Sequence, residues 1–254
     1  MRLAVTLLLP VILTVGCSST GFDGGGSKDQ ALKDHINLGL NYLKEGNRQM
    51  ARTHLRRAME IDSRSAGAHH AMALLLQAEL ENELAEKHYR KAISYDRNFT
   101  RARNNYAIFL FRQQRYDDAY QQLKEAGEDI NYRNRFRVFY SLGIAANMID
   151  KSEAARAAWE KAIALSPSFA LPYLELGKLY FEQGNVVNAR KYLEAFDTLA
   201  KPQAASLWLA VRIADHSGDR DAVASKGLAL EKLFPKSEES RLYEAWLNND
   251  ANKR

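Results

Sequence analysis

The chain repeats a pattern of small, large apolar and polar positions every 34 residues. In the first copy the small positions are Gly39, Ala51 and Ala58. Their equivalents are Ala73, Ala85 and Ala92, then Ala107, Ala119 and Ala126, then, after two extra residues, Gly143, Ala155 and Ala162, then Gly177, Ala189 and Phe196, and in a weaker sixth copy Val211, Val223 and Leu230. Of these 18 positions, 14 are Gly or Ala. Such positions are expected where two helices cross closely, because a large side chain there would hold the helices apart.

Turn and stop signals divide each copy into two helices. Gly46-Asn47 and Gly184-Asn185 lie between the halves of two copies, and Pro167 and Pro235 end two copies, since proline cannot continue a helix. The pattern therefore predicts an all-α chain of helical hairpins over residues 32–235. Residues 236–254 contain Leu242, Tyr243 and Trp246 and predict a capping helix with a polar tail.

This 34-residue helix-turn-helix pattern resembles the tetratricopeptide repeat. The resemblance covers residues 32–235 and implies six repeats stacked into a right-handed superhelix, each repeat burying its face against its neighbours. We expect the chain to be a monomer.

The N-terminus has the pattern of a lipoprotein signal. Arg2 is followed by an apolar run that ends at Cys17, the only cysteine of the chain. This run is too short for a spanning helix, which needs about 20 residues. The junction resembles a bacterial lipobox, although Thr14 stands where leucine is usual. The resemblance implies a signal peptide over residues 1–16, acylation of Cys17, and anchoring at the periplasmic face of the outer membrane, the address that Ser18 implies. Residues 17–31 are rich in glycine and serine and predict a flexible tether.

Composition excludes several classes of function. One cysteine allows no internal disulfide. The net charge is +5 and the pI about 9.2, but the basic residues lack the aromatic interleaving of a nucleic-acid module, so no nucleic-acid partner is expected. The six histidines are scattered, and no metal-binding, phosphate-binding or catalytic motif occurs. We expect no metal, no cofactor and no enzymatic activity.

The repeat register predicts a partner-binding groove. In the tetratricopeptide family the first helix of each repeat lines the concave surface, and many of the matching residues here are large and apolar. Exposed apolar patches mark partner sites, and such a groove suits an amphipathic helix or an extended peptide. The alternative is that the register is shifted or that the N-terminal segment fills the groove. The candidate residues are Ile36, Leu40, Leu43, His70, Leu74, Asn104, Asn105, Ile108, Phe111, Tyr140 and Ile144.

A closer resemblance rests on residues 104–126, NNYAIFLFRQQRYDDAYQQLKEA, and on residues 136–168. With the lipobox and six copies, these segments are similar to the PilW/PilF family of type IV pilus biogenesis lipoproteins. Ala107, Ile108 and Ser141 depart from the family pattern. The resemblance implies a pilotin, which binds the secretin, the outer-membrane ring through which the pilus passes, and promotes its localisation and multimerisation; the pilus would then support functions such as twitching motility. The alternative is a periplasmic scaffold that recruits cell-wall hydrolases or outer-membrane insertion factors.

Overall fold

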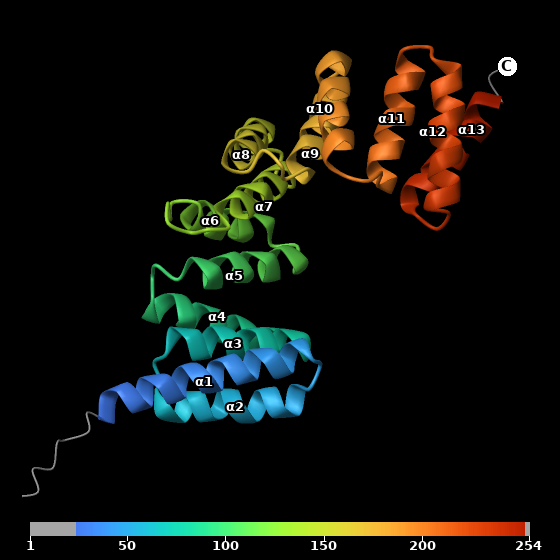
Figure 1. The fold of residues 1–254 in the computed structure, drawn as a ribbon. Coiled ribbons are helices and arrows are strands. Elements are labelled where there is room, and N and C mark those ends of the chain that lie inside the picture. The colour runs from blue at the N-terminus through green and yellow to red at the C-terminus, as the bar shows by residue number, and fades with distance from the viewer. Residues whose placement is uncertain (1–23, 252–254) are drawn as a thin grey trace, which may run out of the picture. The chain divides into compact units, whose positions relative to one another are not determined.

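The computed structural model describes residues 24–251, which form thirteen helices and fall into two compact units. The first unit ends at Ser63 and holds α1 and α2, and the second begins at Arg64 and holds α3 to α13 (Figure 1). The signal peptide over residues 1–16 and the acylation of Cys17 remain predictions that lie outside the described residues.

The first unit is one hairpin of α1 (Gly24–Lys44) and α2 (Arg48–Ile61). The two helices meet at Gly39, where a Cβ atom would lie 2.5 Å from Cδ2 of the buried Leu55. Asn47 begins α2 as its N-cap, because its side chain accepts a hydrogen bond from the backbone N–H of Met50.

The start of α1 corrects the predicted tether. Residues 24–31 were expected to be part of a flexible coil before repeats that begin at 32, but α1 already begins at Gly24. The side chain of Gln30 donates a hydrogen bond to Asp34 across one helical turn, and Ala31 and Leu32 are half-buried. The helix thus extends toward the N-terminus from the packed turn at Ala31 and Leu32, because residues 27–30 contain no proline or glycine that would end it.

The second unit consists of five hairpins and a final single helix. Within each hairpin the two helices pack antiparallel and are joined by a tight turn (Figure 1). The pairs are α3 (Ala66–Ala78) with α4 (Asn82–Tyr95), α5 (Thr100–Arg112) with α6 (Tyr116–Ala126), α7 (Arg135–Asn147) with α8 (Ser152–Leu165), α9 (Leu171–Glu182) with α10 (Val186–Leu199), and α11 (Ala204–His216) with α12 (Arg220–Leu233); α13 (Glu238–Ala251) follows. The two extra residues after the third copy fall in the loop 127–134 between α6 and α7.

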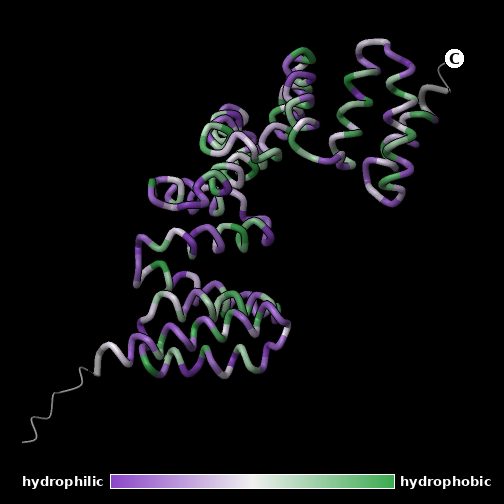
Figure 2. The backbone as a smooth tube through the Cα atoms, in the orientation of Figure 1, coloured by the Kyte–Doolittle hydropathy of each residue, from purple (hydrophilic) through white to green (hydrophobic). Residues whose placement is uncertain are grey.

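Small residues allow the close helix crossings that the repeat predicted. Ala85, Ala119 and Ala155 are fully buried. A Cβ atom at Gly143 would overlap the indole of the buried Trp159, whose Nε1 donates a 3.2 Å hydrogen bond to the carbonyl oxygen of Tyr140. Figure 2 shows hydrophobic and hydrophilic residues interspersed along each of these helices, the pattern expected of helices that bury one side.

Every hairpin turn uses one residue in the left-handed conformation. These residues are Gly46, Leu80, Gln114, Asp150, Gly184 and Gly218, with φ between 58° and 80°. The backbone therefore repeats with the same 34-residue period, apart from the two extra residues between Gln114 and Asp150, while the type of residue at this position varies. Glycine adopts this conformation without strain, whereas a residue with a Cβ atom pays an energetic cost.

The terminal helix α13 closes the apolar end of the array, as predicted for residues 236–254. Tyr243 is 4% exposed, and its ring lies against Gly227, where a Cβ atom would overlap it. Tyr243 also stacks on Trp246, with ring centroids 6.0 Å apart. The helix thereby covers the buried residues of α11 and α12 that a seventh repeat would otherwise cover.

Candidate partner-binding groove

An apolar groove of about 430 Å³ lies between α5 and α7 in the second unit. We call it the α5–α7 groove, and its lining consists of Ala107, Ile108, Phe111, Arg112, Leu123, Tyr140, Ser141 and Ile144. Its volume is in the range of small-molecule and peptide-anchor sites, about 300–1,000 Å³. The only charged side chain in the lining is the exposed Arg112.

The sequence of α5 places apolar residues on two faces of the helix, one buried in the core and one at the groove. Tyr106, Phe109 and Leu110 are buried in the core, and Phe109 and Tyr106 pack on Tyr89 of α4. Ile108 and Phe111 occupy another face at a three-residue spacing, which is why both reach the groove. Ile108 is 37% exposed although it is apolar. Its contact with water is unfavourable, so removal of this apolar surface from water by a bound partner would be favourable.

The structure brings four of the predicted site residues together in this groove. They are Ile108, Phe111, Tyr140 and Ile144. Burial, and to a lesser extent Glu175, raises the pKa of the Tyr140 phenol to about 12, so this side chain stays neutral. These four residues belong to the third and fourth copies, where the groove is formed.

The remaining apolar candidates lie elsewhere. Ile36, Leu40 and Leu43 are half-buried on one face of α1, in the first unit. Leu74 is half-buried on α3 and does not line the α5–α7 groove. These four residues therefore stay predictions as partner contacts.

His70 was expected to face the groove, and this expectation is wrong. Its side chain is 4% exposed, and Nε2 lies 2.9 Å from Nδ2 of Asn105. Burial and, to a lesser extent, the positive charge of Arg101 together lower the pKa of His70 to about 4. The ring is therefore neutral near pH 7 and accepts the hydrogen bond of the Asn105 amide. This hydrogen bond joins α3 to α5 and occupies Nε2 of His70 and Nδ2 of Asn105.

Asn104 differs from its neighbour. Its Oδ1 atom is buried and has no hydrogen-bond partner in the described structure, whereas the residue as a whole is half-buried. An unpaired buried carbonyl costs about 1–3 kcal/mol. Asn104 therefore remains a candidate polar contact next to the α5–α7 groove.

Two pairs of histidines were missed at the sequence level. Nδ1 of His35 lies 3.1 Å from Nδ1 of His54, and Nδ1 of His69 lies 2.9 Å from Nδ1 of His88. Each pair joins the two helices of one hairpin, and the pairs are 34 residues apart. The repeat period was the signal that would have found them. Among residues 24–251 no group of three metal-ligating side chains occurs.

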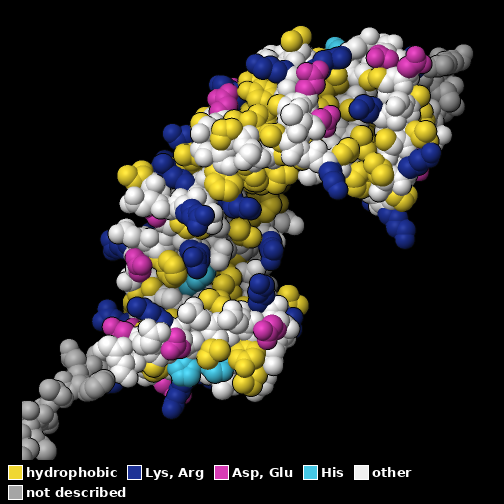
Figure 3. Space-filling view, in the orientation of Figure 1, with side chains coloured by type: hydrophobic (Ala, Val, Ile, Leu, Met, Phe, Trp, Pro, Cys, Tyr) yellow, Lys and Arg dark blue, Asp and Glu magenta, His cyan; other side chains and the backbone are white. Residues whose placement is uncertain are grey.

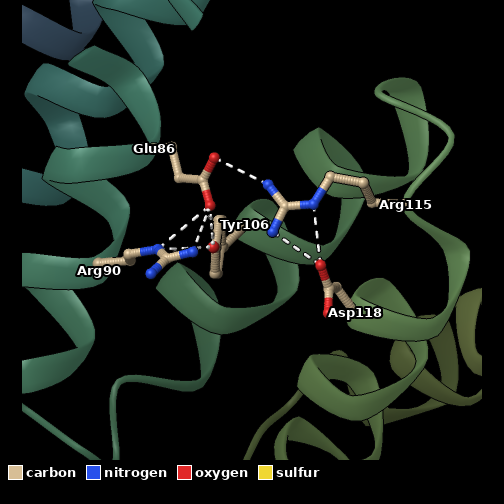
Figure 4. A network of polar contacts seen from close by, with 5 residues as sticks. All are labelled: Glu86, Arg90, Tyr106, Arg115 and Asp118. Atoms are coloured by element: carbon tan, nitrogen blue, oxygen red, sulfur yellow. Dashed lines mark hydrogen bonds and ion pairs between the residues drawn. The ribbon is translucent and has the colours of Figure 1, made fainter. Parts of the chain in front are cut away.

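A polar network fixes the position of α5 (Figure 4). Glu86 of α4 accepts hydrogen bonds from Arg90, Tyr106 and Arg115, and Arg115 also binds Asp118 of α6. Partial burial raises the pKa of Glu86, but the hydrogen bonds from Arg115, Arg90 and Tyr106 outweigh it, so the pKa lies below the ordinary value. The network links the α3–α4 hairpin to the α5–α6 hairpin and so holds α5, the first wall of the groove, in place.

Comparison with known sequences agrees with the helical hairpins. A family model described as a tetratricopeptide repeat matches residues 35–65, and one described as a TPR repeat matches residues 151–184. Among the described residues, none of the helices is both long and apolar enough to cross a membrane. The fold is therefore that of an all-α tetratricopeptide repeat protein.

A relative that matches almost the whole chain identifies the family within the tetratricopeptide repeat proteins. The type IV pilus assembly protein PilF of Pseudomonas aeruginosa (strain PAO1) is 40% identical over 248 residues, which cover 96% of this chain and 98% of that protein. The chain belongs to the PilF/PilW family of type IV pilus assembly proteins, a non-enzymatic family of tetratricopeptide repeat scaffolds.

Solved structures agree at the level of the fold. The structure of Pseudomonas aeruginosa PilF superposes with a TM-score of 0.78 at 40% identity and covers 86% of this chain and 99% of its own. The crystal structure of PilW, described as a widely conserved type IV pilus biogenesis factor, superposes with a TM-score of 0.73 at 23% identity and covers 84% of this chain and 98% of its own.

Proposed function

We propose that this protein is an outer-membrane pilotin that binds the secretin of the type IV pilus and promotes its localisation and multimerisation. Membership of a pilus assembly family supports a role in building the machine. The observation that carries the binding step is the α5–α7 groove, an apolar surface built by well-packed helices and open to solvent. Exposed surface of this kind is characteristic of a partner site.

The proposed anchor follows from the N-terminal sequence. An acylated Cys17 would hold the chain at the inner leaflet of the outer membrane, because each buried methylene contributes about 0.8 kcal/mol. Partner binding and membrane attachment would then occupy different parts of the chain. An unassembled secretin subunit held in the groove would be kept at the membrane in which the ring assembles.

A deletion strain tests the proposal. The strain is fractionated, and heat-resistant secretin multimers are measured in the inner and outer membranes, with the wild-type gene restored as the control. We expect the multimers to disappear and secretin monomers to collect in the inner membrane. A Cys17→Ala variant should restore them poorly, because the protein loses its membrane address. Normal outer-membrane multimers in the deletion strain, with altered cell-wall turnover, would contradict the proposal and favour the scaffold alternative.

A further inference from the structure

The two helices that form the walls of the α5–α7 groove carry charge of one sign only. Helices α5 and α7 together contain five arginines and no aspartate, glutamate or lysine. Helix α6 follows α5 and precedes α7 in the sequence, and it carries charges of both signs: Asp117, Asp118, Lys124 and Glu125. The excess of positive charge is therefore a property of the groove walls rather than of the whole region. In Figure 3 hydrophobic and basic side chains lie side by side over the part of the molecule that α5 and α7 occupy in Figure 1.

Two of the five arginines have structural roles. Nη1 of Arg103 lies 2.6 Å from Oε2 of Glu125, and its other nitrogens donate to the carbonyl oxygen of Arg97. Nε of Arg135 donates a 2.7 Å hydrogen bond to the carbonyl oxygen of Gly127. These contacts tie α5 to α6 and close the loop before α7.

The other three arginines are Arg101, Arg112 and Arg137. Arg112 is part of the groove lining. Arg101 is eleven positions earlier on α5, which is about three helical turns, so it lies on the same face of the helix as Arg112 and Ile108. The guanidinium of Arg137 lies 5.6 Å from the ring centroid of Phe169, whose ring packs edge-on against Tyr140 at 5.4 Å. Within residues 24–251, none of these three arginines forms an ion pair.

Among the described residues, the lining of the groove contains no carboxylate. Glu175 of α9 lies near Tyr140 and raises the pKa of its phenol, but its Oε1 accepts a 3.1 Å hydrogen bond from Nζ of Lys178. An occupant that was wholly apolar would take Arg112 partly out of water without giving it a partner, which costs free energy. A carboxylate offsets this cost, because the planar guanidinium binds it through two parallel hydrogen bonds.

We infer that the α5–α7 groove binds an acidic amphipathic protein segment, with apolar side chains against Ile108, Phe111 and Ile144 and carboxylates against Arg101 and Arg112. The inference rests on the proposed function, of which it specifies the partner's chemistry. Arg101 and Arg112 are eleven positions apart on α5, so their α-carbons are separated by about 16 Å along the helix axis. The segment should therefore carry two acidic groups with a comparable separation, on either side of its apolar residues.

A peptide scan of the secretin tests this inference. Overlapping peptides that cover the periplasmic part of the secretin are probed with the purified mature chain in detergent. We expect the captured peptides to contain an apolar cluster flanked by Asp or Glu. Fluorescence anisotropy of the best peptide should then show that affinity falls as NaCl is raised, because exposed charge pairs are screened by salt.

Charge-reversal variants make the test specific. The double variant Arg101→Glu/Arg112→Glu should weaken binding of that peptide by about tenfold or more. The matched control Arg241→Glu changes an exposed arginine on α13 and should leave binding unchanged. A peptide in which Lys replaces the flanking acids should regain affinity for the double variant. Circular dichroism of each variant checks that the helices are intact.

The outcomes separate the two proposals. A captured secretin peptide that is neutral or basic, or whose binding ignores both charge reversals, overturns the acidic-segment inference and leaves the pilotin proposal standing. Capture of no secretin peptide, together with normal multimers in the deletion strain, overturns both. Binding to vesicles of anionic lipid that displaces the peptide from the wild-type chain but not from the double variant would assign the arginines to a membrane surface and overturn the inference.

Discussion

Leu80 occupies the left-handed position of its hairpin turn, where three other hairpins have glycine. Its φ is 66° and its side chain is 81% exposed, so packing does not compensate the strain. Gly184 has a φ of 76° at the equivalent position, with open space around it. The same turn is therefore strained at Leu80 and unstrained at Gly184. A substitution at each position can measure the free energy of this strain.

We expect Leu80→Gly to stabilise the protein by about 0.5–1 kcal/mol, because relief of the strain exceeds the added entropy of the unfolded chain. The reverse control, Gly184→Ala, should destabilise it by about 1 kcal/mol. Urea unfolding followed by circular dichroism gives both values. A lower free energy of unfolding for Leu80→Gly would show that the exposed leucine makes a stabilising contact.

His70 makes stability dependent on pH. Burial, followed by the effect of Arg101, lowers its pKa to about 4, whereas an unfolded histidine has a pKa of about 6.5. Between these values the unfolded state binds more protons, so stability is complete above pH 6.5 and falls as the pH is lowered toward 4. The difference corresponds to about 3 kcal/mol.

The measurement is the free energy of unfolding from pH 7 to pH 4 for the wild type and for His70→Gln. We expect the variant to be less stable at pH 7 and to lose less stability on acidification. The control His216→Gln changes an exposed histidine and should keep the slope of the wild type. Equal slopes for His70→Gln and the wild type would contradict the account of this buried ring.

At the scale of the helices, the close crossing inside each hairpin is the feature most tightly set by sequence. Gly143 allows α7 to pack on Trp159 of α8, which an added methyl group would displace. We expect Gly143→Ala to destabilise the protein by about 1–3 kcal/mol, as overpacking does in other cores.

A glycine in open space provides the control. Gly26 lies in α1 with no atom near its missing Cβ, so Gly26→Ala should be neutral or should stabilise the helix by up to about 1 kcal/mol. Thermal unfolding of both variants tests the pair. If Gly143→Ala were as stable as the wild type, the crossing would not require a small residue, and the reading of the 34-residue repeat would lose its physical basis.

The helices could be predicted from sequence because their period is local, whereas the contacts beside the groove could not. Small residues at a fixed spacing predicted the hairpins, and the large apolar residues Leu242, Tyr243 and Trp246 predicted the helix that caps them. The burial of His70 depends on Asn105, which is 35 residues away on another helix. The beginning of α1 at Gly24 was missed because glycine and serine favour coil by composition, yet a packed helix can extend through them.

At the scale of the whole molecule, the candidate binding groove is a feature of two adjacent repeats. The predicted groove extended over the first four copies, but the α5–α7 groove uses residues of the third and fourth copies only. The polar network around Glu86 and the His70–Asn105 pair both contact α5, so this wall of the groove is already formed by contacts within the chain. Preformed sites bind more tightly because less ordering is needed on binding.

The affinity of the purified chain for the periplasmic part of the secretin, measured by surface plasmon resonance, tests most directly whether the α5–α7 groove is the secretin site. The variant Ile108→Glu/Ile144→Glu places two carboxylates in the groove, and Val187→Glu/Leu228→Glu places two at exposed apolar positions elsewhere in the second unit. We expect the groove variant to lose at least about 100-fold in affinity, because its charges are desolvated on binding, and the control to bind like the wild type. Equal affinities for the two variants would contradict the assignment of the α5–α7 groove as the secretin site.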